Sequence, residues 1–223
     1  MSTARESKAA LSVVTSTAVD LAGTVLVGLD GSPEVRRAGL LEAVPEVIGY
    51  FTEGSAALAA DFYADERDLA GVRGLFAVDL RINDRTVKIR RAVAWASDPL
   101  FNGDDEAAGK RLAQVVQLET ARPYRDTILD NRRRDPESVG WTRIASPSAC
   151  GFCRLLASKG AIFKKETADF AAHDNCGCTA APVFRGGEMG PEASALQYIG
   201  SKRKRTPAEK AALRDAIAHF ESL

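Results

Sequence analysis

The chain has 223 residues, carries no net formal charge, and is 45% hydrophobic and 27% charged. This composition excludes wholesale disorder and is not that of a membrane-resident protein, and the length suits one substantial core with a small appended module. Residues 141–223 hold 12 Lys and Arg against 8 Asp and Glu, so the C-terminal part is mildly basic. The whole chain has no net charge that would attract nucleic acid or a membrane.

The N-terminal stretch superficially resembles a signal peptide, because Arg5 and Lys8 precede a partly apolar segment. Hydroxyl residues and Asp20 interrupt every apolar run there, and the longest uninterrupted run, residues 25–29, is far too short to span a bilayer. We therefore expect a soluble protein made in the cytosol.

Helical segments are predicted in the first half of the chain. Pro33, with Asp30 or Ser32 as the cap, predicts a helix start, and apolar residues recur at helical spacing up to residue 51. Pro45 lies inside this pattern and predicts a break or a kink. A second helix is expected over residues 55–69, ending near Gly71.

The next segment reads two ways. Residues 76–80 alternate apolar and other residues as a strand does, whereas residues 87–95 fit a short helix as well as a strand. The clearest helix then begins near Asp104, whose neighbouring carboxylates favour a helix N-terminus, and ends at three arginines before Pro136. Pro123 lies inside it and leaves one helix or two open.

All four cysteines and one of the two histidines fall within 29 residues, as Cys150, Cys153, His173, Cys176 and Cys178. Zinc takes four thiolate or imidazole ligands, and a C-x2-C turn presents two thiolates to one ion. Five candidates for four places leave one spare. Cys150, Cys153 and His173 are favoured, while Cys176 and Cys178 remain alternatives for the fourth place.

Three other readings of the cysteines compete with a structural zinc site. The thiols can simply pack in a core, or form disulfides if the protein meets oxidising conditions. A catalytic thiol needs a neighbouring base, and the chain offers only His173 and His219. The density and spacing of the ligands favour zinc.

The C-terminal part holds further local signals. Residues 179–184 read as a strand, and Thr206, Pro207 and Glu209 predict a helix start with a capping box. The predicted fold is mainly α with a small α+β zinc-stapled C-terminal module. Its predicted divisions are a helical assembly domain over residues 1–138, a Cys/His module over 139–187, and a basic linker with a final helix over 188–223.

The segments GWTR at residues 140–143, ACGFCRLLASKGAIF at 149–163, HDNCGC at 173–178 and APVF at 181–184 form a recognisable signature. It resembles the C-terminal signature of MuF-like minor capsid (head morphogenesis) proteins of actinobacterial tailed phages. The resemblance covers about residues 139–185; Lys159 and Phe163 stand where that family commonly has arginine and tyrosine.

The resemblance implies a structural virion protein and not an enzyme. Its expected place is the capsid interior, after synthesis in the host cytoplasm. Its expected partners are the portal protein, other capsid or scaffold proteins, and packaged DNA, with no membrane and no small-molecule substrate. The alternative is a zinc-dependent nucleic-acid-binding accessory protein; a thiol or toxin-like enzyme ranks third.

The alternative rests on a basic run of four residues, Lys202, Arg203, Lys204 and Arg205. Such a run can neutralise DNA phosphates with an affinity that falls as salt rises. More often such a run is a solvated linker, here before the last helix.

Overall fold

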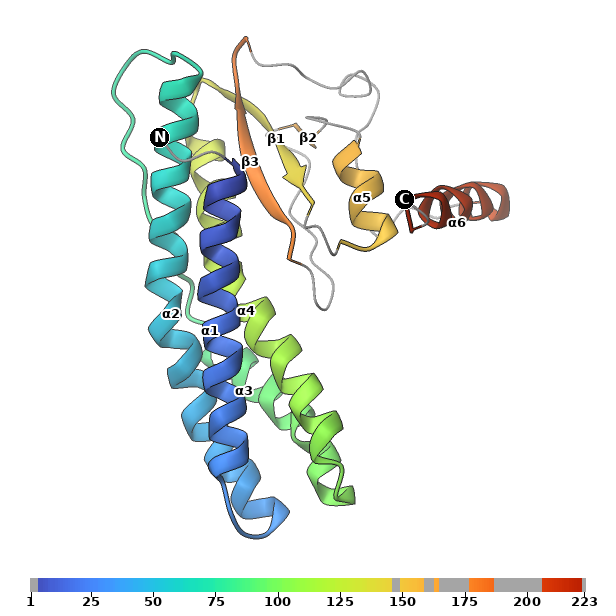
Figure 1. Cartoon of the computed structure of the whole chain (residues 1–223). Coiled ribbons are helices and arrows are strands. Elements are labelled where there is room, and N and C mark those ends of the chain that lie inside the picture. The colour runs from blue at the N-terminus through green and yellow to red at the C-terminus, as the bar shows by residue number, and fades with distance from the viewer. Residues whose placement is uncertain (1–3, 146–148, 159–162, 165–176, 187–205, 222–223) are drawn as a thin grey trace.

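The computed structural model describes residues 4–145, 149–158, 163–164, 177–186 and 206–221. Helix accounts for 73% of these residues, which confirms the prediction of a mainly α protein. Three long helices form an elongated bundle, and a small sheet with two further helices lies beside one end of it (Figure 1).

The bundle consists of α1 (Ala4–Gly28), α2 (Pro33–Leu69) and α4 (Asp105–Arg134), with the short helices α3 (Thr86–Ala96) and η1 (Asp98–Asn102) against its far end. Apolar side chains from all three long helices meet there in a core that includes Ala22, Leu40, Val44, Leu112 and Val116. Its residues recur every three or four positions, so each helix buries one stripe.

Helix α1 was not predicted from the sequence. Most of its buried side chains are small or polar, which hides the pattern: Ser7, Leu11, Thr15, Ala18, Ala22 and Leu26. Their spacing of three and four residues is nevertheless that of one helical face. Among the described residues, α1 alone is long and apolar enough to cross a membrane by length and composition, and a core or signal helix passes the same test.

Two prolines lie inside continuous helices. The helices predicted up to residue 51 and over residues 55–69 are the single helix α2, which continues through Pro45, so the chain does not break there. Pro123 likewise lies within an unbroken α4. A proline inside a helix costs about 3 kcal/mol through one lost hydrogen bond and a steric clash. Packing of neighbouring side chains such as Val44 and Ile48, which are almost fully buried, offsets that cost.

The helix starts follow the predicted caps. Helix α2 begins with Ser32 as the cap residue and Pro33 in its first turn. Asp104 caps α4 by accepting a hydrogen bond from the amide of Ala107 at 2.8 Å. The predicted helix starts are therefore confirmed at these two caps, whereas the helices continue through Pro45 and Pro123.

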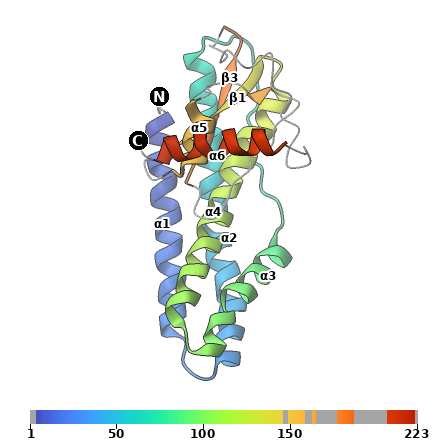
Figure 2. The same ribbon diagram turned by 90° about the vertical axis from the view of Figure 1, so that its right-hand side faces the viewer.

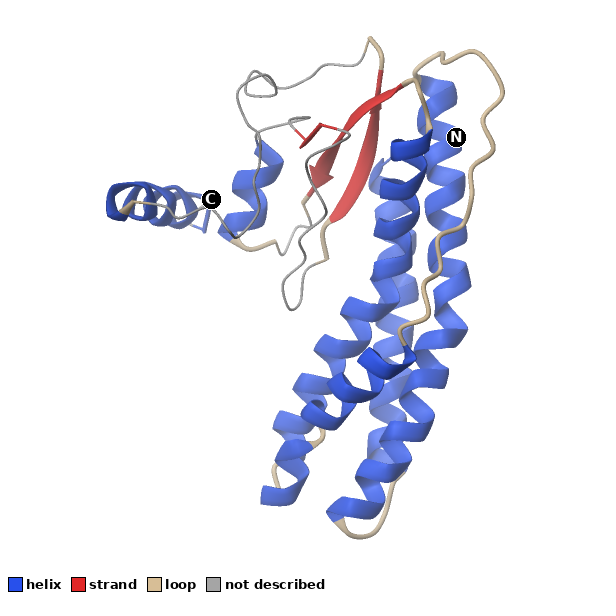
Figure 3. Ribbon diagram, turned by 180° about the vertical axis from the view of Figure 1, so that it is seen from behind, coloured by secondary structure: helices blue, strands red, loops and turns tan. Residues whose placement is uncertain are grey.

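The alternating segment at residues 76–80 is extended but belongs to no strand pair. It runs along the bundle as a loop (Figure 3). The side-chain oxygen of Asn131 accepts from the amide of Asp79 at 2.9 Å, its amide group donates to the Asp79 carbonyl at 2.7 Å, and Thr127 accepts from the amide of Arg81. Side chains of α4 thus replace a neighbouring strand, and the strand prediction is wrong.

The sheet has the strand order β2-β1-β3, with both pairs antiparallel. Its strands are β1 (Ser138–Ile144), β2 (Phe163–Lys164) and β3 (Thr179–Phe184), and β3 confirms the strand predicted there. Trp141 of β1 and Phe184 of β3 point into a core that also contains Tyr63 of α2 and Tyr124 of α4. The ring centroids of Tyr63 and Phe184 lie 5.5 Å apart, edge to face.

This core crosses the predicted division at residue 138. Its members come from α1, α2, α4, β1 and β3, so the sheet and the near end of the bundle bury one shared set of side chains. The predicted division implies that residues 139–187 can unfold separately from the helices, and unfolding measurements on tryptophan variants test this.

The last helix, α6 (Pro207–Glu221), confirms the predicted capping box. The amide of Thr206 donates to the Glu209 carboxylate at 2.8 Å, and the amide of Glu209 donates to the Thr206 hydroxyl at 3.2 Å. Helix α6 lies beside α5 (Gly151–Ser158), away from the bundle (Figure 2).

The shared core predicts that Trp141→Ala lowers the free energy of unfolding by about 3–5 kcal/mol, because the indole fills space between the bundle and the sheet. Urea titration of Trp95→Ala, whose single remaining tryptophan is Trp141, should show helix content and tryptophan fluorescence changing in one transition, because Trp141 lies in the core that the bundle and the sheet share. The matched control is Trp95→Ala at a side chain 46% exposed, expected to cost no more than about 1 kcal/mol. Loss of sheet structure with an unchanged helix transition would contradict the single core.

Candidate metal centre

Three of the five predicted zinc ligands lie in described parts of the chain. Cys150 immediately precedes α5, Cys153 lies in its first turn, and Cys178 immediately precedes β3. His173 and Cys176 lie outside the described residues, as do Lys202, Arg203, Lys204 and Arg205. The nucleic-acid alternative therefore stays a prediction.

Cys150 and Cys153 lie on one side of the start of α5. The carbonyl of Cys150 accepts the amide of Arg154 at 3.0 Å, so Cys150 begins the helical hydrogen-bond pattern. Residues three apart on a helix share a face. The C-x2-C spacing is thereby converted into two neighbouring thiols.

Strand pairing explains how Cys178 reaches the same place. Ile144, the last residue of β1, pairs with Thr179, the first residue of β3. Because the strands are antiparallel, the chain leaving β1 toward Cys150 and the chain entering β3 through Cys178 lie at the same end of the sheet.

The thiols form a small cluster at this end of the sheet. Cys153 and Cys178, each 1% exposed, pack with Ala149, and the half-buried Cys150 packs against them with Phe152 and Ala145. These three cysteines form no disulfide with one another. Two segments about 25 residues apart in the sequence are thus joined by sulfur-bearing side chains.

Two buried arginines contact the cluster. Nη1 of Arg143, on β1, lies 3.8 Å from Sγ of Cys153. Nε of Arg125, on α4, donates to the carbonyl oxygen of Cys178 at 3.1 Å. Both arginines are 4% exposed, so their charges act at low dielectric. A nearby guanidinium stabilises a thiolate relative to a thiol, and a thiolate is the form that binds metals.

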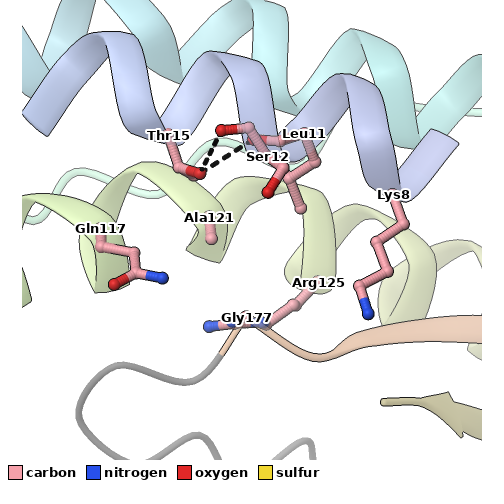
Figure 4. A pocket seen from close by; sticks show the side chains of 8 residues that line it. All are labelled: Lys8, Leu11, Ser12, Thr15, Gln117, Ala121, Arg125 and Gly177. Atoms are coloured by element: carbon pink, nitrogen blue, oxygen red, sulfur yellow. Dashed lines mark hydrogen bonds between the residues drawn. The ribbon is translucent and has the colours of Figure 1, made fainter. Parts of the chain in front are cut away.

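A third cation connects the bundle to this end of the sheet. Nζ of Lys8, on α1, donates to the carbonyl oxygen of Ala145, just after β1. Lys8 and Arg125 flank a small cavity of about 30 Å³ between α1, α4 and Gly177 (Figure 4). That volume holds about one water molecule, so the cavity is a packing gap and not a substrate site.

The chemistry available here is that of soft sulfur ligands beside fixed positive charge. Such a donor set fits zinc better than magnesium or calcium, which take oxygen ligands. Within the described ranges no group of three or more His, Cys, Asp or Glu side chains has metal-binding geometry. The three cysteines are gathered near one another, and zinc binding stays a prediction.

No sequence pattern points to Lys8 or Arg125 as neighbours of the cysteines. Both lie far from the Cys motif in sequence, so only the packing of α1 and α4 against the sheet brings them in. The alternation of β1, with Trp141 and Arg143 on one side, was a signal that Arg143 points inward.

The comparisons place this arrangement in a known family. The sequence profile described as VG15 protein matches residues 2–199. The chain belongs to the VG15 protein family. This is a phage-associated viral family, so the chain is a phage protein. No curated protein and no solved structure gives a significant match. The VG15 match spans α1 through β3, so the bundle and the cysteine cluster belong to one family unit.

The arginine contact predicts a specific local effect. Arg125→Leu keeps most of the side-chain volume but removes the donor to Cys178, and should lower the free energy of unfolding by about 1.5–3 kcal/mol. In the metal-free variant, alkylation of Cys178 should be faster than in the metal-free wild type. Peptide mass spectrometry measures the rate. Arg122→Leu is the control, because Arg122 is one turn away and pairs with Glu119. Equal alkylation rates in the two variants would show that Arg125 does not hold the cluster closed.

Proposed function

We propose that this VG15 family protein is a minor capsid, or head morphogenesis, protein: a structural part of the virion similar to MuF-like proteins. The observation that carries the proposal is that the signature residues gather in two clusters, the shared core and the thiol cluster. Trp141, Cys150, Cys153 and Cys178 all belong to the segments that carry the MuF-like resemblance, and they form the sheet core and the thiol cluster. The phage family is consistent with this role.

The proposed cofactor is one structural zinc ion. Cys150, Cys153 and Cys178 would supply three thiolates, and His173 the fourth ligand. The packing of Cys178 against Cys153 supports Cys178 as a ligand, and Cys176 would then be the spare thiol. Four protein ligands close a zinc site, so the metal would stabilise the fold and leave no position for a substrate. Arg143 and Arg125 would offset the negative charge of the thiolates.

The proposed role is non-enzymatic. A nucleophilic thiol has to meet its substrate, but Cys153 and Cys178 are almost completely buried. Burial is instead what a structural ligand needs, because exclusion of water and competing ligands keeps the metal in place.

The proposed location is the interior of the procapsid, at the portal vertex. The 37 residues of α2 make a bundle about 55 Å long, at 1.5 Å per residue. A rod of this length, fixed by a shared core to a module at one end, suits a protein that joins two partners. The portal protein and capsid or scaffold proteins are the proposed partners, and packaged DNA is a further one.

The ligand assignment makes a sharp prediction. Purified protein should contain about one zinc per chain by elemental analysis, and Cys178→Ser should lose most of it, because a hydroxyl is a poor zinc ligand. Cys176→Ser should keep the zinc. These two variants are matched controls, since they make the same change two residues apart.

Each other outcome has a definite meaning. Zinc lost from Cys176→Ser but kept in Cys178→Ser would reverse the assignment of the spare thiol. Wild-type protein without zinc, purified under reducing conditions and after addition of zinc, would overturn the metal proposal.

The capsid role predicts association with the portal. When the protein is produced together with the portal protein of the same phage, the two should be recovered as one complex, and particles should contain the protein. Cys153→Ser should reduce recovery at least severalfold if the module makes the contact, while Cys176→Ser should not. If cells that produce the protein assemble particles that do not contain it, the structural role is contradicted.

A further inference from the structure

The outer face of α1 is almost without charge. From residue 9 to residue 28 the only charged side chain is Asp20. Val13 is 64% exposed, Leu21 43% and Val27 83%. The other exposed positions there are Ala9, Ser12, Ser16, Thr17, Thr24 and Gly28. A helix on the surface of a soluble protein normally carries charged and polar residues on this side, so this face is suited to being covered.

Three of the four exposed hydroxyl groups on this face are already hydrogen-bonded within the helix. Ser16 and Thr17 donate to the carbonyl of Val13 at 3.1 and 2.8 Å, and Thr24 donates to the carbonyl of Asp20 at 3.0 Å. Removing these side chains from water therefore leaves no hydroxyl donor unsatisfied. The cost of covering the face is correspondingly low.

Two opposite charges, Arg5 and Asp20, lie at separate positions on one stripe of α1, which residues 5, 9, 16 and 20 form. Residues 5, 9, 16 and 20 lie within about 60° of one another around the helix, at 100° per residue. Arg5 and Asp20 are both exposed, and neither makes an ion pair with a described residue. They are about 22 Å apart along the axis. One end of the stripe is thus positive and the other negative.

We propose that this face binds a second copy of the chain through antiparallel pairing of the two α1 helices. When the twofold axis passes between Ser12 and Val13, Arg5 of each copy lies opposite Asp20 of the other, and Ala9 lies opposite Ser16. Small side chains at the centre let the two helices approach closely, and both ion pairs form by symmetry. Parallel pairing would instead oppose like charges.

The neighbouring surface leaves room for a second helix. A hollow of about 720 Å³ lies along the stripe at Arg5, Ala9 and Ser12, with Ile144 and Ala145 on its other side. The surface beside the stripe is therefore concave there. One helix pair buries less than the roughly 1,200 Å² of a standard interface, so the dimer should be weak and salt-sensitive.

A membrane is the other cover that a long apolar helix fits, and Asp20 argues against it. Asp20 lies near the middle of α1, where an aspartate costs about 2.5–3.5 kcal/mol in a bilayer. Opposite an arginine of a second copy, the same carboxylate is stabilising. The proposal rests on the surface of α1 and is independent of the capsid role.

Sedimentation velocity of the full chain over a range of concentrations tests the pairing. The wild type should self-associate at tens to hundreds of micromolar, the weak end of specific binding, and less so at high salt. Arg5→Asp and Asp20→Arg should each weaken the dimer about tenfold or more, because each opposes like charges at two places. The double variant Arg5→Asp/Asp20→Arg should restore it.

Controls separate the alternatives. Arg90→Asp makes the same charge change on the exposed side of α3 and should leave the dimer intact. All four variants should keep the wild-type circular dichroism, because the mutated side chains are exposed. A wild type that stays monomeric at every concentration, or a double variant that stays as weak as the single ones, would overturn the proposal. Flotation of the wild type with lipid vesicles, abolished by a second charge at Val13→Asp, would assign the face to a membrane instead.

Discussion

The buried carboxylate of Asp135 sets how the chain leaves the bundle and enters the sheet. It ends α4 at a fully buried position, where it pairs with Nε of Arg67 at 3.0 Å and accepts from the hydroxyl of Tyr63 at 3.3 Å. Its other oxygen accepts the amide of Glu137 at 3.0 Å. A buried charge is tolerated only when it is paired and hydrogen-bonded, so α2 must lie where Arg67 and Tyr63 can reach it. The direction of β1 follows from that constraint.

The cysteine cluster depends on this turn in two steps. Asp135 fixes the start of β1, and Trp141 then packs into the core shared with α2 and α4. The far end of β1 consequently lies along α1 and α4, where Lys8 and Arg125 bind the carbonyls of Ala145 and Cys178. The bundle therefore supplies part of the positive charge beside the thiols, and Arg143 of β1 supplies a further part. The two parts of the molecule are connected through electrostatics as well as packing.

Local signals in the sequence predicted local structure, and long-range contacts lay beyond them. The Asp104 cap and the Thr206 capping box involve residues three apart, so their geometry is written in the sequence itself. The loop at residues 76–80 looked like a strand because its pattern is that of a half-buried extended chain; its partner is Asn131 of α4, which no periodicity reveals. The C-x2-C motif identified the cluster, but two of its cationic neighbours, Lys8 and Arg125, come from helices that are distant in the sequence.

The placement of cations on the bundle also bears on what a metal would do to the whole molecule. A ligand that binds only the folded state stabilises every part that unfolds with its site. Arg125 and Lys8 connect the cluster to α4 and α1, and the core around Trp141 connects the same helices to the sheet. Binding free energy at the thiols would accordingly be shared by the bundle. In a rod fixed at one end to such a module, stabilising the thiol cluster also holds the orientation of α1, and with it the direction in which its uncharged face points.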